Sequence, residues 1–283
     1  MIKTRIYLFL FSSLLLAQSN SEMVKINIST TMDIAFAGKI FLNTTQLASS
    51  DFYNEEVVSK YEKFYVRMFA GGNKTVGKIL DKQNQALIMY DKDEKKYSQE
   101  MFKSIKENNG VPSLKDVTKM EPGGSGDRSG GSSDSTRSNN QNNVNREITR
   151  IISNDLIDIN GFNCRKISTK ISDNNGSVQI DEWITSDTSL FEFVENKLIG
   201  LIALYGGIHE KPRGSFDWIK AIDPNKKIDS IKGEIIKSSI VWKNDEGKNS
   251  FSMTREVLSA VTTDYTSEQF EILKKFKKVP NLD

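Results

Sequence analysis

A long polar tract over residues 121–145 divides the sequence; Gly, Ser, Asn and Asp predominate in it, and Val144 is its only clearly apolar residue. A segment of this composition has too few apolar groups to bury a core, so we predict a disordered linker. The folded part must then come from the flanking segments, residues 20–120 and 146–283. We expect them to be the N-terminal and C-terminal parts of one β-sheet domain.

The N-terminus has the order of a secretory signal peptide. Lys3 and Arg5 precede an apolar run over residues 6–16, and the small residues Ala17 and Ser19 follow it. Because the run is shorter than the roughly 18 apolar residues of a membrane helix, cleavage after Ala17 or Ser19 is favoured, with a retained anchor as the alternative. No cysteine for lipid attachment lies near this site. We expect a soluble protein of the bacterial envelope, periplasmic or secreted, with no transmembrane segment after cleavage.

Charge and cysteine content limit the classes of partner and of covalent link. The chain has 39 Lys and Arg against 37 Asp and Glu, and the signal segment, residues 1–19, holds two basic residues and no acidic one. The mature chain is therefore formally neutral, which argues against a nucleic-acid partner. Cys164 is the single cysteine, so the mature chain has no internal disulfide and must be stabilised by burial alone.

Short runs of β-branched and aromatic residues, bounded by turn residues, predict strands in both parts of the chain. Asn175-Gly176 and Gly247 mark two hairpin turns, because these residue types adopt the positive φ angles of tight turns. The predicted strands cover residues 24–28, 64–69, 75–80, 86–90, 164–171, 178–185, 235–242 and 251–257.

Two helices are expected among these strands. The first covers residues 189–205, begins with a capping box of Ser189 and Glu192, and ends before Gly206. Its apolar face is unusually wide. The second covers residues 266–278, with lysines in its last turns, where cations favour the helix dipole. The predicted fold class is β-rich α+β.

The part of the chain after the linker carries a motif that spans two predicted strands. It reads Gly161, Phe162, any residue, Cys164 and two basic residues, and the next strand carries Glu182-Trp183 and then Thr-x-Asp. A family of exported bacterial proteins with a domain of unknown function has the same order. The chain resembles this family.

The part before the linker resembles the same family. Residues 87–91 resemble its hydrophobic strand, and Lys95-x-Tyr97 resembles its Lys-x-Tyr hairpin. The resemblance extends over about residues 60–104 and 145–276. This family is similar in fold to the periplasmic lipoprotein carrier LolA, which implies a curved antiparallel sheet, a half-barrel, with helices that close a hydrophobic groove. It also implies an apolar ligand, such as a lipid or the acyl chain of a lipoprotein.

The wide apolar face of the first helix supplies the candidate groove residues. If the helix covers a curved sheet incompletely, a lipid-sized pocket remains; if it seals a closed core, its width is ordinary. Trp218 and Trp242 could line the same groove, although packing in the sheet is the plainer interpretation. The candidate groove residues are Phe191, Val194, Leu198, Leu201, Ile202 and Trp183.

No motif in the sequence identifies a catalytic or metal site. His209 is the only histidine, and a nucleophilic pair with Cys164 is conceivable, although a buried Cys and a loop His are commoner. Asp91, Asp93 and Glu94 lack the spacing of a calcium loop and predict a solvated turn. We therefore expect a binding protein without cofactor, metal or enzyme activity. The alternative is a structural or sensory envelope protein that acts through protein–protein contacts.

Overall fold

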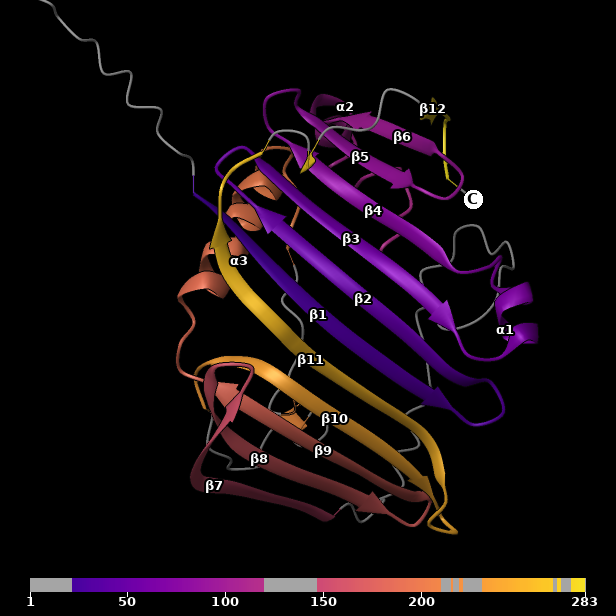
Figure 1. The fold of residues 1–283 in the computed structure, drawn as a ribbon, viewed down its shortest axis with the longest axis vertical. Coiled ribbons are helices and arrows are strands. Elements are labelled where there is room, and N and C mark those ends of the chain that lie inside the picture. The colour runs from indigo at the N-terminus through magenta and orange to yellow at the C-terminus, as the bar shows by residue number, and fades with distance from the viewer. Residues whose placement is uncertain are drawn as a thin grey trace, which may run out of the picture.

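The described part of the chain contains a single 12-stranded β-sheet with helices packed against it (Figure 1). This is a computed structural model, and the predicted signal peptide, the linker over residues 121–145 and Trp218 lie outside the residues that it describes. The described residues are 22–119, 147–209, 215, 219–220, 231–266, 269–270 and 276–282.

Strands make up most of the described residues. The helices are α1 (Phe64–Phe69), α2 (Phe102–Glu107) and α3 (Ser189–Ala203). The strands are β1 (Met23–Ile34), β2 (Gly38–Ala48), β3 (Phe52–Tyr61), β4 (Lys74–Asp81), β5 (Ala86–Asp91), β6 (Lys96–Met101), β7 (Glu147–Ile159), β8 (Phe162–Asp173), β9 (Gly176–Thr185), β10 (Glu234–Asn244), β11 (Asn249–Thr263) and β12 (Lys277–Lys278).

The strands before and after the predicted linker join in one sheet. Its order is β12-β6-β5-β4-β3-β2-β1-β11-β10-β9-β8-β7, and every neighbouring pair is antiparallel except β12 with β6. The two halves meet where β1 pairs with β11, from Met23 opposite Thr263 to Ile34 opposite Phe251. The ends of this order, β12 and β7, do not pair with each other, so the sheet is open. The predicted fold class is confirmed.

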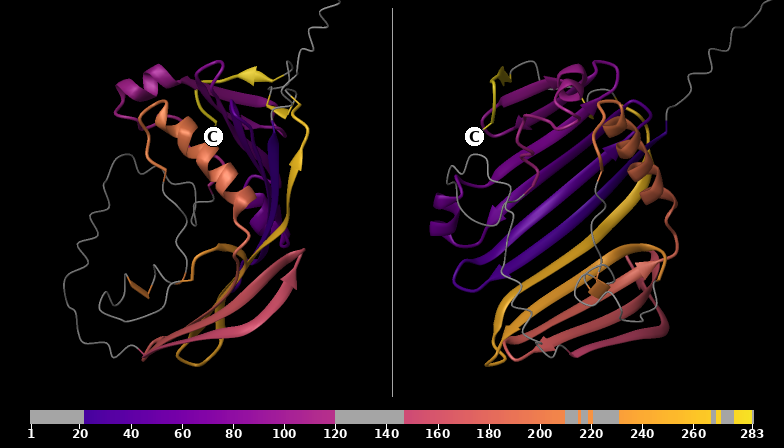
Figure 2. Two further views of the ribbon diagram at one scale, coloured as in Figure 1. Left: turned by 90° about the vertical axis from the view of Figure 1, so that its left-hand side faces the viewer. Right: turned by 180° about the vertical axis from the view of Figure 1, so that it is seen from behind.

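The sheet is curved, and the longest helix lies on its concave side. Seen from the side, the strands of the C-terminal half swing away from those of the N-terminal half, and α3 crosses the inside of the bend (Figure 2, left). α3 contacts β1, β2, β3, β4 and β11. The helix therefore covers the centre of the concave face.

Near the centre of the sheet both faces are covered, because side chains alternate between faces along each strand. In β1, Val24, Ile26 and Ile28 pack in the hydrophobic cluster that includes α3. Their neighbour Met23 belongs to a separate cluster with Phe270, a residue of the C-terminal segment. Apolar residues on both faces explain why β5 is buried along its whole length.

The predicted hairpins of the C-terminal part are confirmed. β8 and β9 pair from Cys164 opposite Thr185 to Asp173 opposite Gly176, so the turn falls at the Asn-Gly pair. β10 and β11 are joined by a turn at Gly247, whose φ is 76°. Gly206 follows α3 with φ 79°, as predicted for the end of that helix.

The predicted strand over residues 64–69 is wrong, because these residues form α1. Gly71 and Gly72 follow the helix with positive φ, and their N–H groups donate to Met68 O at 3.3 Å and Arg67 O at 2.8 Å. This pair of bonds is the glycine cap that ends many helices. The two glycines thus end a helix instead of separating two strands.

The C-terminal end of the second predicted helix is corrected. Lys277 and Lys278 form β12, a short strand parallel to β6, whereas residues 267–268 and 271–275 of the predicted helix lie outside the described part. Lys277 N donates to Lys95 O at 2.8 Å, and Val279 N donates to Tyr97 O at 2.8 Å. The free edge of β6 offers backbone acceptors at this point, and pairing with them replaces helical bonds.

The predicted capping box at the start of α3 is not formed. The N-cap residue is Thr188, whose hydroxyl donates to Glu192 Oε1 at 2.7 Å. Because the cap lies one residue earlier than predicted, Glu192 is at the fourth helical position, whereas a capping box needs it at the third.

Candidate functional site

The five candidate groove residues of α3 all pack into the central hydrophobic cluster. Phe191, Val194 and Leu201 are buried, and Leu198 and Ile202 are half-buried against the same cluster. The ring of Phe191 lies 5.7 Å from that of Phe162, between centroids. The apolar face of α3 is therefore in contact with the concave face of the sheet.

Trp183, the sixth candidate, contacts this cluster from β9 and has a partly polar environment. Lys166 Nζ lies 5.0 Å and Lys237 Nζ 5.8 Å from the centroid of its ring. Both lysines are paired, with Asp181 at 3.0 Å and Glu256 at 2.9 Å. Cations over a tryptophan ring fix its orientation, so Trp183 is held in place on its strand. In β10, Trp242 is 43% exposed.

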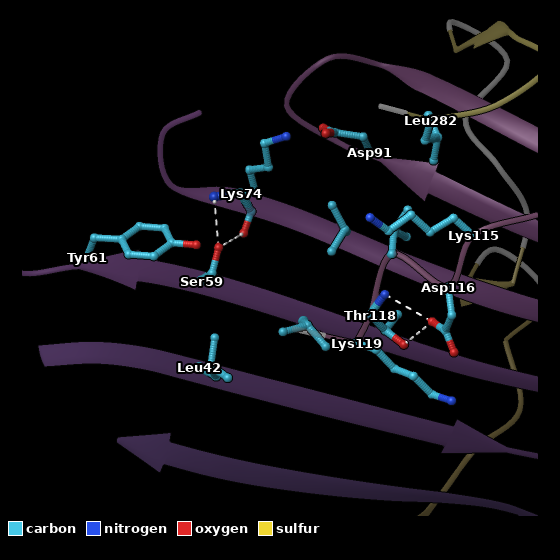
Figure 3. A pocket seen from close by; sticks show the side chains of 13 residues that line it. Leu42, Ser59, Tyr61, Lys74, Asp91, Lys115, Asp116, Thr118, Lys119 and Leu282 are labelled. Atoms are coloured by element: carbon cyan, nitrogen blue, oxygen red, sulfur yellow. Dashed lines mark hydrogen bonds between the residues drawn. The ribbon is translucent and has the colours of Figure 1, made fainter. Parts of the chain in front are cut away.

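A pocket of about 190 Å³ opens on the face of β2, β3 and β4 that α3 contacts (Figure 3). Its floor is apolar, with Leu42, Val57 and Val76. Val57 and Val76 are direct cross-strand partners, and Leu42 lies opposite Ser59, so strand register places these side chains on one face. The segment 115–119 and Leu282 form the opposite wall.

The wall of the pocket is continuous with the central cluster. Val117 and Leu282 line the pocket and are also packed against the cluster that contains α3. Thr118 holds the turn of this wall, because its N–H and its hydroxyl donate to Asp116 Oδ1 at 3.0 Å and 2.6 Å. The pocket therefore adjoins the cluster in which α3 packs against the sheet.

The ends of the pocket are polar. Figure 3 shows Tyr61 and Lys74 at one end and Asp116 towards the other. Ser59 Oγ donates to Lys74 O at 3.3 Å and accepts from Lys74 N, so this hydroxyl forms its hydrogen bonds with the backbone of β4. Lys115 and Lys119 add two more ammonium groups to the lining.

A partly buried ion cluster fastens the pocket wall to the sheet. Lys78 Nζ on β4 lies 3.4 Å from Glu55 Oε1 on β3 and 3.1 Å from Asp116 Oδ2 in the wall. Tyr53 donates its hydroxyl hydrogen to Glu55 Oε2 at 2.7 Å, and Gln46 donates to the same oxygen at 3.1 Å. One lysine thus connects the wall with the strand beneath it.

The electrostatics of this cluster favour its charged form. Burial alone would raise the pKa of Glu55, but the ammonium of Lys78 and the hydrogen bonds from Tyr53 and Gln46 lower it below its ordinary value. Burial likewise disfavours the charge of Lys78, but Glu55 and Asp116 raise its pKa. Burial, with Glu55 next in size, raises the pKa of Tyr53 well above its ordinary value.

Sequence reasoning missed both the pocket and this cluster. A signal was present, because residues two apart in a strand lie on the same face. Glu55 shares its face of the strand with Tyr53 and Val57, and Lys78 shares its face with Val76 and Leu80. A charged residue on the buried side of a strand must find a partner, so this arrangement indicates an ion pair.

The carboxylates of Asp91 and Asp93, which were considered for a calcium loop, accept hydrogen bonds from backbone N–H groups. The Asp91 carboxylate accepts the N–H groups of Asp93 and Glu94 at 2.9 Å and 2.8 Å, and Asp93 accepts that of Thr75 at 2.6 Å. Among the described residues, no group of three or more His, Cys, Asp or Glu could hold a metal ion. Within the same residues, no helix has both the length and the hydropathy needed to cross a membrane.

Cys164 is fully buried, and burial raises the pKa of its thiol to about 11. Since the thiolate is the reactive form, we expect Cys164 in the folded protein to react with a disulfide reagent such as Ellman's reagent at pH 8 far more slowly than in denaturant. The measurement is the rate of thionitrobenzoate release with and without guanidinium. Equal rates in both conditions would contradict the buried, protonated state.

No protein-family model and no curated protein matches the chain. A comparison with solved structures matches the chain with a LolA superfamily protein from Nitrosomonas europaea, with 7% identity, a TM-score of 0.23, and coverage of 89% of this chain and 90% of that chain. Another match is an outer membrane lipoprotein-sorting protein domain from Vibrio parahaemolyticus, with 6% identity, a TM-score of 0.23, and coverage of 89% and 92%. A TM-score of this size carries no argument, so the fold class rests on the strands themselves.

Proposed function

We propose that the protein binds or carries an apolar ligand, a lipid or a lipoprotein acyl chain, in the pocket beside α3. The observation that supports this most directly is the apolar floor of the pocket, Leu42, Val57 and Val76, on the concave face of an open sheet. Apolar pockets with a few polar groups are typical of small-molecule binding sites. We place the proposed site on β2–β4 beside α3, whereas the sequence predicted a groove lined by the apolar face of α3 itself.

The size and polarity of the pocket favour a chain-like ligand. Its volume of about 190 Å³ is below the roughly 300–1,000 Å³ of sites that enclose a drug-sized ligand. Part of one acyl chain fits such a volume, with its polar end outside the apolar floor. Lys74, at the Tyr61 end of the pocket, suits a carboxylate or phosphate there (Figure 3).

The proposed setting is the bacterial envelope. The N-terminal order of Lys3 and Arg5, an apolar run and small residues favours export as a cleaved, soluble protein. A carrier in an aqueous compartment must shield acyl chains from water, because each buried CH₂ group contributes about 0.8 kcal/mol. An open sheet that is partly covered by one helix can shield an acyl chain from water and still allow the chain to enter and leave.

A paired substitution tests the pocket. Leu42 is half-buried in its floor, whereas the adjacent Phe41 is 38% exposed and points to the other face of β2. We expect Leu42→Asp to weaken binding of a fluorescent fatty acid by about tenfold or more, because an unpaired carboxylate in an apolar site costs several kcal/mol. Fluorescence titration of the mature protein measures the dissociation constant.

Phe41→Asp is the matched control, and we expect it to bind the fatty acid as the wild type does. Thermal unfolding of both variants separates loss of binding from loss of fold. A wild-type protein that does not take up the fatty acid, or a Leu42→Asp variant with unchanged affinity, would reject the pocket as the ligand site.

A further inference from the structure

One end of the sheet carries a group of exposed aromatic side chains, which we name the aromatic tip. It consists of α1, between β3 and β4, and the turn between β1 and β2 (Figure 1). No residue of α1 is buried. The exposed fractions are 90% for Phe36, 82% for Phe69, 68% for Phe64, 59% for Met68 and 47% for Tyr65.

The aromatic tip is held in a defined shape. Tyr65 donates its hydroxyl hydrogen to Phe36 O, and Lys63 Nζ donates to the same oxygen at 2.7 Å. Phe36 has a φ of 71°, a left-handed conformation that is uncommon for a bulky side chain. The glycine cap described above fixes the end of α1. These contacts hold the two segments together while their apolar groups point outwards.

Basic residues surround these aromatic side chains. Within residues 60–74 there are four basic residues and one acidic residue, Glu62. Arg67 lies over the ring of Phe64 at 5.4 Å, and Lys63 Nζ lies over that of Tyr65 at 5.7 Å, each to the centroid. The tip therefore combines large apolar groups with a local positive charge on a chain that is otherwise close to neutral.

We propose that the aromatic tip docks on the surface of an anionic lipid bilayer. Aromatic rings insert at the boundary between headgroups and acyl chains, while lysine and arginine remain among the phosphates. Local positive charge adds attraction to anionic lipids. A projecting tip of this kind suits a deformable lipid surface, whereas a protein partner would have to supply a matching cavity with acidic groups.

The aromatic tip is joined directly to two strands that line one end of the pocket. Tyr61 is the last residue of β3 and Lys74 the first of β4; both line the pocket, and α1 lies between them in the chain. Docking of α1 thus brings this end of the pocket to the membrane surface. The docking itself does not depend on the pocket, because it rests on the exposed rings and their basic neighbours.

Co-sedimentation with vesicles tests the proposal on the mature full-length protein. We expect wild-type protein to bind vesicles of mixed phosphatidylcholine and phosphatidylglycerol more strongly than pure phosphatidylcholine vesicles. Phe64→Ser with Phe69→Ser should reduce the partition coefficient by about tenfold or more, since two large rings no longer enter the interface. Lys63→Gln with Arg67→Gln should weaken binding to the anionic vesicles and lower its salt dependence.

Two exposed apolar residues elsewhere provide the matched control. Ile151 is 69% exposed on β7, and Ile208 is 90% exposed after α3. Ile151→Ser with Ile208→Ser removes comparable apolar surface and should leave vesicle binding unchanged. Leu42→Asp should also bind vesicles normally, so failure of the pocket is distinguishable from failure of the tip.

The proposal is overturned if wild-type protein remains in the supernatant with anionic vesicles. It is equally overturned if the double phenylalanine variant binds as the wild type does, or if the isoleucine control loses binding to the same extent. Thermal unfolding of each variant verifies that these substitutions of exposed residues leave the fold intact.

Discussion

Replacing Lys78 by methionine is expected to lower the free energy of unfolding by about 3 kcal/mol. Methionine has a similar length, so the loss is mainly of charge. Glu55 and Asp116, which lie 3.4 Å and 3.1 Å from the ammonium, would remain close together without a cation. Guanidinium denaturation at pH 7 measures the change.

The matched control is Lys82→Met. Lys82 follows β4 directly and pairs with Asp51 at 3.0 Å, but this pair is on the surface, with 48% of the lysine side chain exposed. An exposed pair contributes about 0–1 kcal/mol, so the control should unfold almost as the wild type does. Equal losses in the two variants would mean that partial burial does not strengthen the Lys78 cluster.

The pH dependence of Lys78→Met gives a second criterion. Without the ammonium, burial and mutual repulsion raise the pKa of the two carboxyl groups in the folded state above their unfolded values. Groups with raised folded pKa destabilise the fold when ionised, so the deficit should shrink as the pH falls towards 4. A deficit that is independent of pH would indicate lost packing instead.

The second large effect is expected for Leu201→Ala, at about 3 kcal/mol of unfolding free energy. Leu201 is 3% exposed in α3 and belongs to the central cluster, so its truncation leaves a cavity between helix and sheet. Ile199 is on the same helix and is 42% exposed, so Ile199→Ala should cost less than about 1 kcal/mol. Thermal and guanidinium unfolding compare the two variants.

This comparison also distinguishes a core helix from a lid. If α3 is part of the cooperative core, Leu201→Ala lowers the midpoint of global unfolding. If α3 opens independently, the global midpoint stays constant and uptake of the fluorescent fatty acid changes instead. The burial of Phe191, Val194 and Leu201 leads us to expect the first result.

Several elements were predictable because their signals are local. The hairpin of β8 and β9 follows from Asn175-Gly176, and α3 follows from an apolar face that ends at Gly206. In both cases the turn residue and the period of apolar residues lie within one short segment. Predictions from such signals are reliable because the backbone conformation of these segments depends on few contacts with distant parts of the chain.

The error at α1 has a specific physical cause. The run Phe64–Phe69 is aromatic and would suit a strand, but every side chain in it remains outside the core. Strand preference is mostly a preference for packing on a half-buried sheet, so it has no effect where no sheet is available. With the strand contacts absent, the cap at Gly71 and Gly72 decides the local structure.

The sequence by itself determined the locations of β1, β4, β5 and β8 to β11, the hairpin turns of the C-terminal part, the extent of α3 and the absence of an internal disulfide, but predicted no strand at β2, β3, β6 or β7. Only the tertiary structure decided that β1, near the start of the described chain, pairs with β11, near its end. It also decided that Lys78 forms ion pairs with both Glu55 and Asp116. These contacts join segments far apart in sequence. Their partners depend on strand order and register, which no single segment encodes, because the free energy of such contacts is gained only when the whole sheet assembles.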